Sequence, residues 1–107
     1  MFLFRPHKAQ YLNLQKKIEA LESELSSYLE SLSTKSVSFP YAKLHDLHVE
    51  INSIRNNNVK ALLLGALNEK IVGRLYHYSP KLFPMYQSIQ DQITELTANE
   101  QTTFDCF

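Results

Sequence analysis

Apolar residues recur at alternating steps of three and four along the first third of the chain. The positions are Tyr11, Leu14, Ile18, Leu21, Leu25, Tyr28 and Leu32. This is the heptad spacing of an amphipathic helix, and no Gly or Pro interrupts it. The pattern predicts one long helix over residues 8–33, with a length of roughly 38 Å at 1.5 Å per residue.

Polar segments delimit a second helix. A Ser- and Thr-rich segment over residues 33–39 runs into Pro40, which suits the first turn of a helix because its missing N–H is not needed there. A run of three asparagines over residues 56–58 then favours a helix end. Between them, heptad spacing recurs, and we expect a helix over residues 40–55 with an apolar stripe of Leu44, Leu47, Ile51 and Ile54.

The third predicted helix, over residues 59–78, is apolar on every side in its first half, residues 61–67. Such a helix is surrounded by protein, either as the central helix of the domain or with one side covered by another chain. Gly65 and Gly73 are small enough to let a neighbouring helix approach closely. After a Pro-bracketed turn over residues 79–83, a fourth helix is expected over residues 84–98.

No stretch alternates apolar and polar residues, so no sheet is expected. The sequence predicts an all-α fold: an antiparallel four-helix bundle with a long heptad-patterned first helix. Residues 1–107 form a single helical domain in this prediction, with loose termini at 1–7 and 99–107. Helices two and four are too short to cover helix one, so one end of its seam, either Tyr11 and Leu14 or Tyr28 and Leu32, is expected to be uncovered. We therefore expect a homodimer through the seam of Tyr11, Leu14, Ile18, Leu21, Leu25, Tyr28 and Leu32.

Composition narrows the range of partners. The 107 residues include 11 basic and 11 acidic side chains, and this neutral balance gives no overall field that attracts nucleic acid. The longest apolar run, residues 61–67, is far too short to span a bilayer. The single cysteine, Cys106, cannot form an internal disulfide, so a cytoplasmic, reducing compartment is the simplest expectation. Export by a route without a local motif stays open.

Two histidines on the second helix, His45 and His48, are the main candidates for chemistry. Helix positions three apart are neighbours, so these two imidazoles could share a weakly bound metal ion. No third ligand is indicated by spacing, and we predict no metal or other cofactor. In size and architecture the chain also resembles a histidine phosphotransfer domain, which implies a phosphate-accepting histidine. The Lys-Gly pair that follows the histidine in that family is absent here, and Glu50 would repel phosphate.

Enzyme activity is not expected. The chain has no Gly-x-Ser-x-Gly motif, and Cys106 has no histidine nearby in the sequence. Paired carboxylates such as Glu22 and Glu24 are two apart, which places them on different faces of a helix. We therefore predict no catalytic residues.

The segment over residues 74–86 is the most informative local feature. It combines large apolar rings with an arginine and a methionine around a turn stiffened by Pro80 and Pro84. These residue types are enriched at protein interfaces. The candidate partner-binding residues are Arg74, Tyr76, Tyr78, Phe83, Met85 and Tyr86. The predicted function is a small non-catalytic helical protein-binding module, an adaptor or inhibitor of another protein that binds through the heptad seam of helix one and this aromatic turn. The alternatives are a histidine phosphotransfer-type bundle and a weak metal-binding domain.

Overall fold

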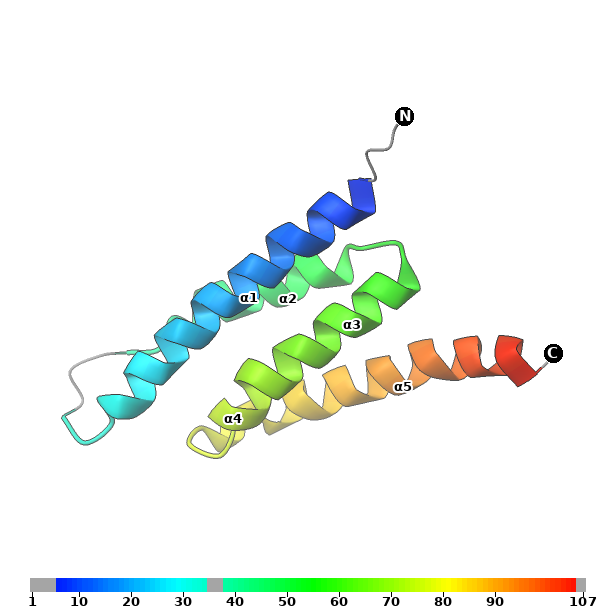
Figure 1. Ribbon diagram of the computed structural model, residues 1–107. Coiled ribbons are helices and arrows are strands. Elements are labelled where there is room, and N and C mark those ends of the chain that lie inside the picture. Colours follow the sequence, from blue (N-terminus) through cyan, green and yellow to red (C-terminus); the bar gives the residue numbers. More distant parts are fainter. Residues whose placement is uncertain (1–5, 35–37, 106–107) are drawn as a thin grey trace.

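The computed structural model describes the backbone of residues 6–34 and 38–105, and the side chains of residues 8–34 and 38–98. Every regular element in those ranges is helical, so the predicted all-α class is confirmed (Figure 1). The elements are α1 (Pro6–Glu30), α2 (Tyr41–Asn52), α3 (Asn57–Leu67), the π-helix η1 (Asn68–Val72), α4 (Gly73–Leu75), the 3₁₀ turn η2 (Pro80–Leu82) and α5 (Phe83–Asp105).

The central element of the fold is the continuous helical run α3–η1–α4. α3 contacts α1, α2 and α5, and η1 contacts α1 and α5 as well. α5, in contrast, makes its main contacts with α3, η1 and η2 only. Figure 1 shows the chain reversing direction at each connection, with α5 diverging from the other helices toward its C-terminal end. The helix that is apolar all round is therefore the one with the most neighbours.

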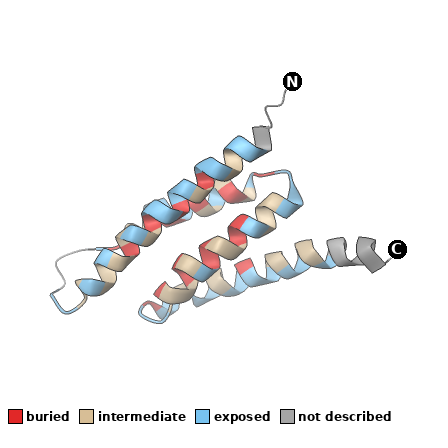
Figure 2. Ribbon diagram, viewed as in Figure 1, coloured by how far each residue is buried: buried red, intermediate tan, exposed pale blue. Residues whose placement is uncertain are grey.

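The heptad seam of α1 faces this chain's own core. Leu14, Ile18, Leu21 and Leu25 are at most 3% exposed, and Tyr11 and Tyr28 pack partly buried against the same core. Figure 2 shows the buried parts of α1 on the side of the helix that faces the other helices. The expected exposure of Leu14 at one end of the seam is wrong, because Leu14 is fully buried; at the other end, Tyr28 and Leu32 are partly buried. The reason is that α3 and η1, as well as α2, lie against α1.

Several helix ends differ from the predicted ones. The third helix starts two residues earlier than predicted, because Asn56 caps it by accepting a hydrogen bond from the Val59 N–H at 3.0 Å. This run ends as a helix at Leu75, followed by a turn over residues 76–78. α5 begins at Phe83 and extends to Asp105, beyond the predicted end at Ala98.

The two glycines of the central run have different surroundings. A Cβ on Gly73 would lie 2.7 Å from the Asn68 carbonyl oxygen and 3.2 Å from the Tyr86 ring. Glycine at this position thus allows the close approach of α5 and the wide turn of the π-helix. A Cβ on Gly65 would meet nothing within 4 Å, so no packing within the described chain requires a glycine there.

The glycines are predicted to respond in opposite directions to alanine. Gly65→Ala should raise the free energy of unfolding by about 0.5–1 kcal/mol, because alanine is the better helix former and its methyl group has open space. Gly73→Ala should lower it, because the methyl group would collide with backbone. Urea unfolding followed by circular dichroism measures both, and a destabilising Gly65→Ala would show that Gly65 is needed by the monomer.

The seam of α1 is predicted to carry the stability of the monomer. Leu25→Ala should cost about 2–5 kcal/mol, because it removes a fully buried side chain and leaves a cavity. Leu12→Ala, on the exposed side of the same helix, serves as the matched control and should change the unfolding free energy by less than about 0.5 kcal/mol. Equal effects in urea unfolding would contradict the assignment of the seam to the core.

Candidate functional site

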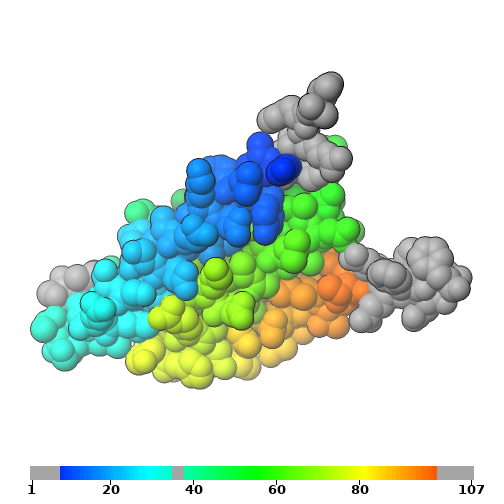
Figure 3. All heavy atoms as spheres, in the orientation of Figure 1, coloured from blue at the N-terminus to red at the C-terminus, as the bar shows by residue number. Residues whose placement is uncertain are grey.

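A surface groove runs between the central helical run and α5, with a volume of about 640 Å³. We call it the α3–α5 groove. Figure 3 shows α3 as a green band that reaches the surface between the blue α1 and the yellow to orange α5. The central helical run forms one wall of the α3–α5 groove, and α5 forms the other. The first wall includes Leu62, Gly65, Ala66, Asn68, Glu69 and Arg74, and the second includes Tyr86 and Gln90.

The groove contains the most exposed large apolar side chain of the described residues. Leu62 is 62% exposed, whereas the adjacent Leu63 and Leu64 are buried. The difference follows from the neighbours of α3, since α1, α2 and α5 cover its other faces. Gly65 and Ala66 follow Leu62 on the groove wall, so this part of the wall is apolar and shallow.

The predicted aromatic turn forms a ring cluster at the end of the groove. The Tyr76 ring lies 4.8 Å from the Tyr86 ring and 5.5 Å from the Phe83 ring, measured between centroids. His77 stacks on Tyr76 at 4.6 Å. Such separations are typical of stabilising aromatic pairs. The cluster joins the turn after α4 to the first turns of α5.

The structure brings only some of the predicted partner-binding residues together. Arg74 and Tyr86 line the groove, and Tyr76 and Phe83 contact Tyr86. Met85 is partly buried against the core, and Tyr78 is exposed without being a lining residue of the groove. The candidate binding surface at the groove therefore includes fewer residues than the set predicted from the sequence.

Arg74 has a partner within the chain. Its guanidinium lies 3.6 Å from the Glu22 carboxylate, which ties α4 to α1. Both side chains are partly exposed, so the pair contributes little to stability. In the groove, the positive charge of Arg74 is balanced by the Glu22 carboxylate.

Sequence reasoning missed Asn68, the most unusual polar group of the site. Asn68 is only 3% exposed, and its Nδ2 donates a hydrogen bond to the Tyr86 carbonyl oxygen at 3.1 Å. Its buried Oδ1 has no hydrogen-bond partner among the described residues. An unsatisfied buried acceptor costs about 1–3 kcal/mol. The signal for Asn68 in the sequence is its amide side chain directly after the apolar Leu67 and shortly before the apolar Ile71.

Asn68 also begins the π-helix η1. A π-helical turn is rare, and it occurs frequently at functional sites. Here the π-helical turn and the buried amide fall within one turn of helix on the groove wall.

The predicted histidine pair lies away from this groove. His45 is exposed on α2, whereas His48 is half-buried and its Nε2 is a buried atom without a hydrogen-bond partner in the described chain. Close by, Gln92 of α5 donates to the Asn52 amide oxygen at 2.7 Å. Within the described side chains, no three His, Cys, Asp or Glu residues are placed to hold a metal ion. Cys106 lies outside the described residues.

The environment of His48 favours its neutral form. Burial lowers the pKa of its imidazole below the ordinary value of 6.5, and the nearby His45 lowers it further. An interaction with the Gln92 side chain opposes this by raising the pKa, but burial is the larger effect. Protonation of His48 is therefore less favourable in the folded chain than in the unfolded one.

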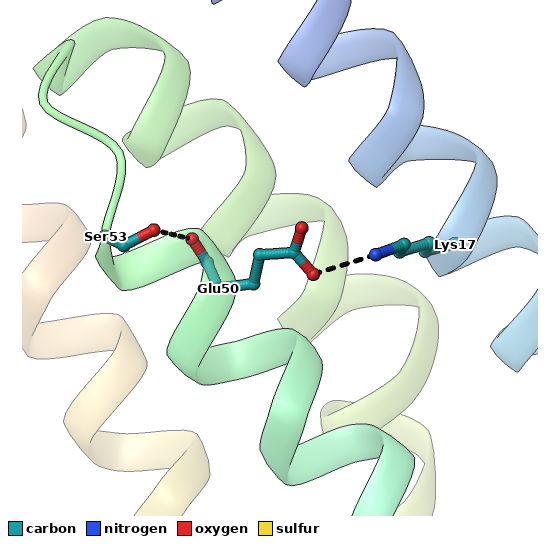
Figure 4. A network of polar contacts seen from close by, with 3 residues as sticks. All are labelled: Lys17, Glu50 and Ser53. Atoms are coloured by element: carbon teal, nitrogen blue, oxygen red, sulfur yellow. Dashed lines mark hydrogen bonds and ion pairs between the residues drawn. The ribbon is translucent and has the colours of Figure 1, made fainter.

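A smaller cleft between α1 and α2, of about 260 Å³, is spanned by ion pairs. The Lys17 ammonium lies 2.9 Å from a Glu50 carboxylate oxygen, and Lys43 lies 3.1 Å from Glu24. Figure 4 shows Lys17 and Glu50 reaching toward each other, while the Ser53 hydroxyl donates to the Glu50 carbonyl oxygen. These groups are partly exposed and pair with each other, so each pair contributes little to stability and helps to align the two helices.

Comparison with known proteins finds no family model, no curated protein and no solved structure that matches this chain. Among the described residues, no helix has the length and apolar character required to cross a membrane. The candidate function therefore depends on the geometry of the α3–α5 groove and the residues around it.

The lowered pKa of His48 predicts a loss of stability in mild acid. The unfolded chain binds the proton more readily, so stability is complete above the ordinary histidine pKa of 6.5 and falls as the pH drops below it. The slope attributable to one proton cannot exceed about 1.4 kcal/mol per pH unit. Urea unfolding between pH 7.5 and 5.5 measures it.

His48→Gln should reduce this pH dependence, whereas the control His45→Gln, which removes only the smaller electrostatic contribution to the lowered pKa, should retain most of it. An unchanged slope in His48→Gln would assign the acid sensitivity to another group.

Proposed function

We propose that this protein is a small non-catalytic helical protein-binding module that acts as an adaptor or inhibitor of a partner protein. The observation that carries the proposal is the exposure of Leu62 beside the small residues Gly65 and Ala66 on one wall of the groove. Contiguous exposed apolar patches commonly mark interaction sites, whereas single exposed apolar residues do not. Burying one leucine fully contributes about 1.5–3 kcal/mol.

The aromatic cluster also favours the α3–α5 groove as the binding surface. Tyr76, Phe83 and Tyr86 lie at one end of the groove, and they are held by contacts with one another. Aromatic rings fixed before binding lose little conformational freedom on association, and such rings dominate the binding energy of many interfaces. The cluster is the proposed anchor, and the stretch around Leu62 is the proposed apolar contact.

The binding surface proposed here replaces the α1 seam as the main contact. The central seam residues are covered by this chain, so a partner could reach them only if the monomer opened. Homodimerisation stays a prediction, as does the finer description of the fold as an antiparallel four-helix bundle. Support for the bundle comes from the alternating chain directions in Figure 1 and the burial of the heptad positions of α1.

Two single substitutions separate binding from general surface effects. Leu62→Asp should abolish capture of the partner, because it places a charge in the apolar groove. Val49→Asp is the matched control, since Val49 is 54% exposed on α2 and lies outside the groove. Circular dichroism should show that both variants remain helical.

The measurement is quantitative affinity capture from the source cell, with the wild type and both variants as baits. Proteins recovered by the wild type and Val49→Asp but lost with Leu62→Asp are the expected partners. If both variants recover the same proteins as the wild type, the proposed surface is wrong.

A further inference from the structure

We propose that His48, Asn52 and Gln92 form a pH-sensitive latch, which holds the second half of α5 against α2 while His48 is neutral and opens when His48 is protonated. We call these three residues the α2–α5 latch. The inference goes beyond the proposed binding surface, because none of the three residues lines the α3–α5 groove. It depends on a hydrogen bond between two helices, on the weak packing of part of α5, and on a buried ring nitrogen.

The latch joins two helices that have no extensive interface. The Gln92 side chain donates a hydrogen bond from its Nε2 to the Asn52 amide oxygen at 2.7 Å, and both side chains are half-buried. His48 lies one turn before Asn52 on α2, and it interacts with the same Gln92 side chain. The main contacts of α5 are with α3, η1 and η2. The latch is therefore a local polar contact of α5 with α2.

The second half of α5 is packed more weakly than its beginning. Among the described side chains of α5, Ile89 is the one that is fully buried, whereas Ile93 and Leu96 are only partly buried. The beginning of the helix is fixed by the hydrogen bond from Asn68 to the Tyr86 carbonyl oxygen. Figure 1 shows α5 diverging from the other helices toward its C-terminal end. Segments with few buried apolar contacts open locally at a low cost in free energy.

The buried nitrogen makes the closed latch sensitive to protonation. His48 Nε2 is a buried atom without a hydrogen-bond partner in the described chain. A protonated ring carries an N–H group on both nitrogens and a positive charge, and burial without an acceptor is costly for both. Because Gln92 interacts with this ring from α5, movement of α5 away from α2 gives the ring access to water. Protonation of His48 therefore favours the open latch.

The charged groups around His48 do not offset this cost. Burial lowers the pKa of His48 more than any other influence, and the nearby His45 lowers it further. Glu50 on the same helix is paired with Lys17 of α1. The other charged residues of α2, of the loop that follows it, of the start of α3 and of the second half of α5 are Lys43, Asp46, Arg55, Lys60, Asp91 and Glu95. Lys43 is paired with Glu24, and the electrostatic influence on His48 comes from His45.

The test uses the full-length protein with a nitroxide spin label at Ser53→Cys, an exposed position next to Asn52, and with Cys106→Ser to leave a single thiol. The label broadens the NMR signals of nearby amides, so it reports how close residues 93–98 of α5 lie to the end of α2. Between pH 7.5 and 5.5 the broadening of residues 93–98 should decrease. Residues 57–60, at the start of α3, are the internal control and should stay broadened.

The size of the response is limited by the single proton involved. The ratio of open to closed molecules, obtained from the broadening of residues 93–98, should rise by no more than about tenfold per pH unit. The midpoint of this change should coincide with the titration midpoint of the His48 ring, followed through its own NMR signals in the same samples.

Variants assign the response to His48. His48→Gln and His48→Leu both remove the titrating ring, and each should keep residues 93–98 close to the label at both pH values. The matched control is His45→Gln, at an exposed histidine of the same helix, which should retain most of the response.

Three outcomes would overturn the latch. The first is unchanged broadening of residues 93–98 in the unsubstituted histidine background over this pH range. The second is a response that persists in both His48 variants or has a midpoint different from that of the His48 ring. The third is a loss of broadening at residues 57–60 together with residues 93–98, which would show unfolding of the whole chain instead of opening between α2 and α5.

Discussion

The burial of the central helical run is the constraint on which the rest of the structure depends. Its side chains Leu63, Leu64, Leu67, Ile71, Val72 and Leu75 are at most 1% exposed. No single neighbour can cover residues that point in so many directions, so α1, α2 and α5 all pack on this run. A helix that is apolar all round needs protein on every side, and three neighbours leave one strip uncovered. The groove with Leu62 is that strip.

The π-helical turn connects this core to the placement of α5. The turn begins at Asn68, whose amide bonds to the Tyr86 backbone, and the Tyr86 ring lies close to the backbone at Gly73. Three residues, one each from η1, α4 and α5, thus fix how α5 lies on the central run. The aromatic cluster adds contacts between the turn at Tyr76 and the same part of α5. The groove is consequently held in shape on the side where α5 begins.

The sequence predicts the helices and much of the core, because both follow from local spacing. The buried positions Leu14, Ile18, Leu21 and Leu25 are all members of the predicted seam. What covers that seam could not be read from spacing, since the same heptad pattern suits a partner chain or the chain's own helices. The role of α3 beside α1 is a long-range contact, and it removes the predicted uncovered end at Leu14.

The candidate site shows the same division between local and long-range information. Tyr76, Phe83 and Tyr86 are close in sequence, and their rings contact one another in the structure, whereas their role in binding stays a prediction. Asn68 was missed because its importance depends on Tyr86, eighteen positions away, and on a π-helical turn that has no composition signal. Tyr78 has the right residue type for binding, but the turn places it outside the groove.

Three features that conflict with the stability of the monomer belong to residues of one groove. An exposed leucine, a glycine with open space in a helix, and an asparagine whose buried oxygen has no partner among the described residues all line the α3–α5 groove. Each one is unfavourable for an isolated chain. Outside the groove, the buried Nε2 of His48 and the exposed Val49 are isolated features of the same kind. Conflicts between local preference and global fold are expected at functional sites, where binding compensates the loss of stability. Their coincidence in a single groove is thus a stronger argument for function than any one of them alone.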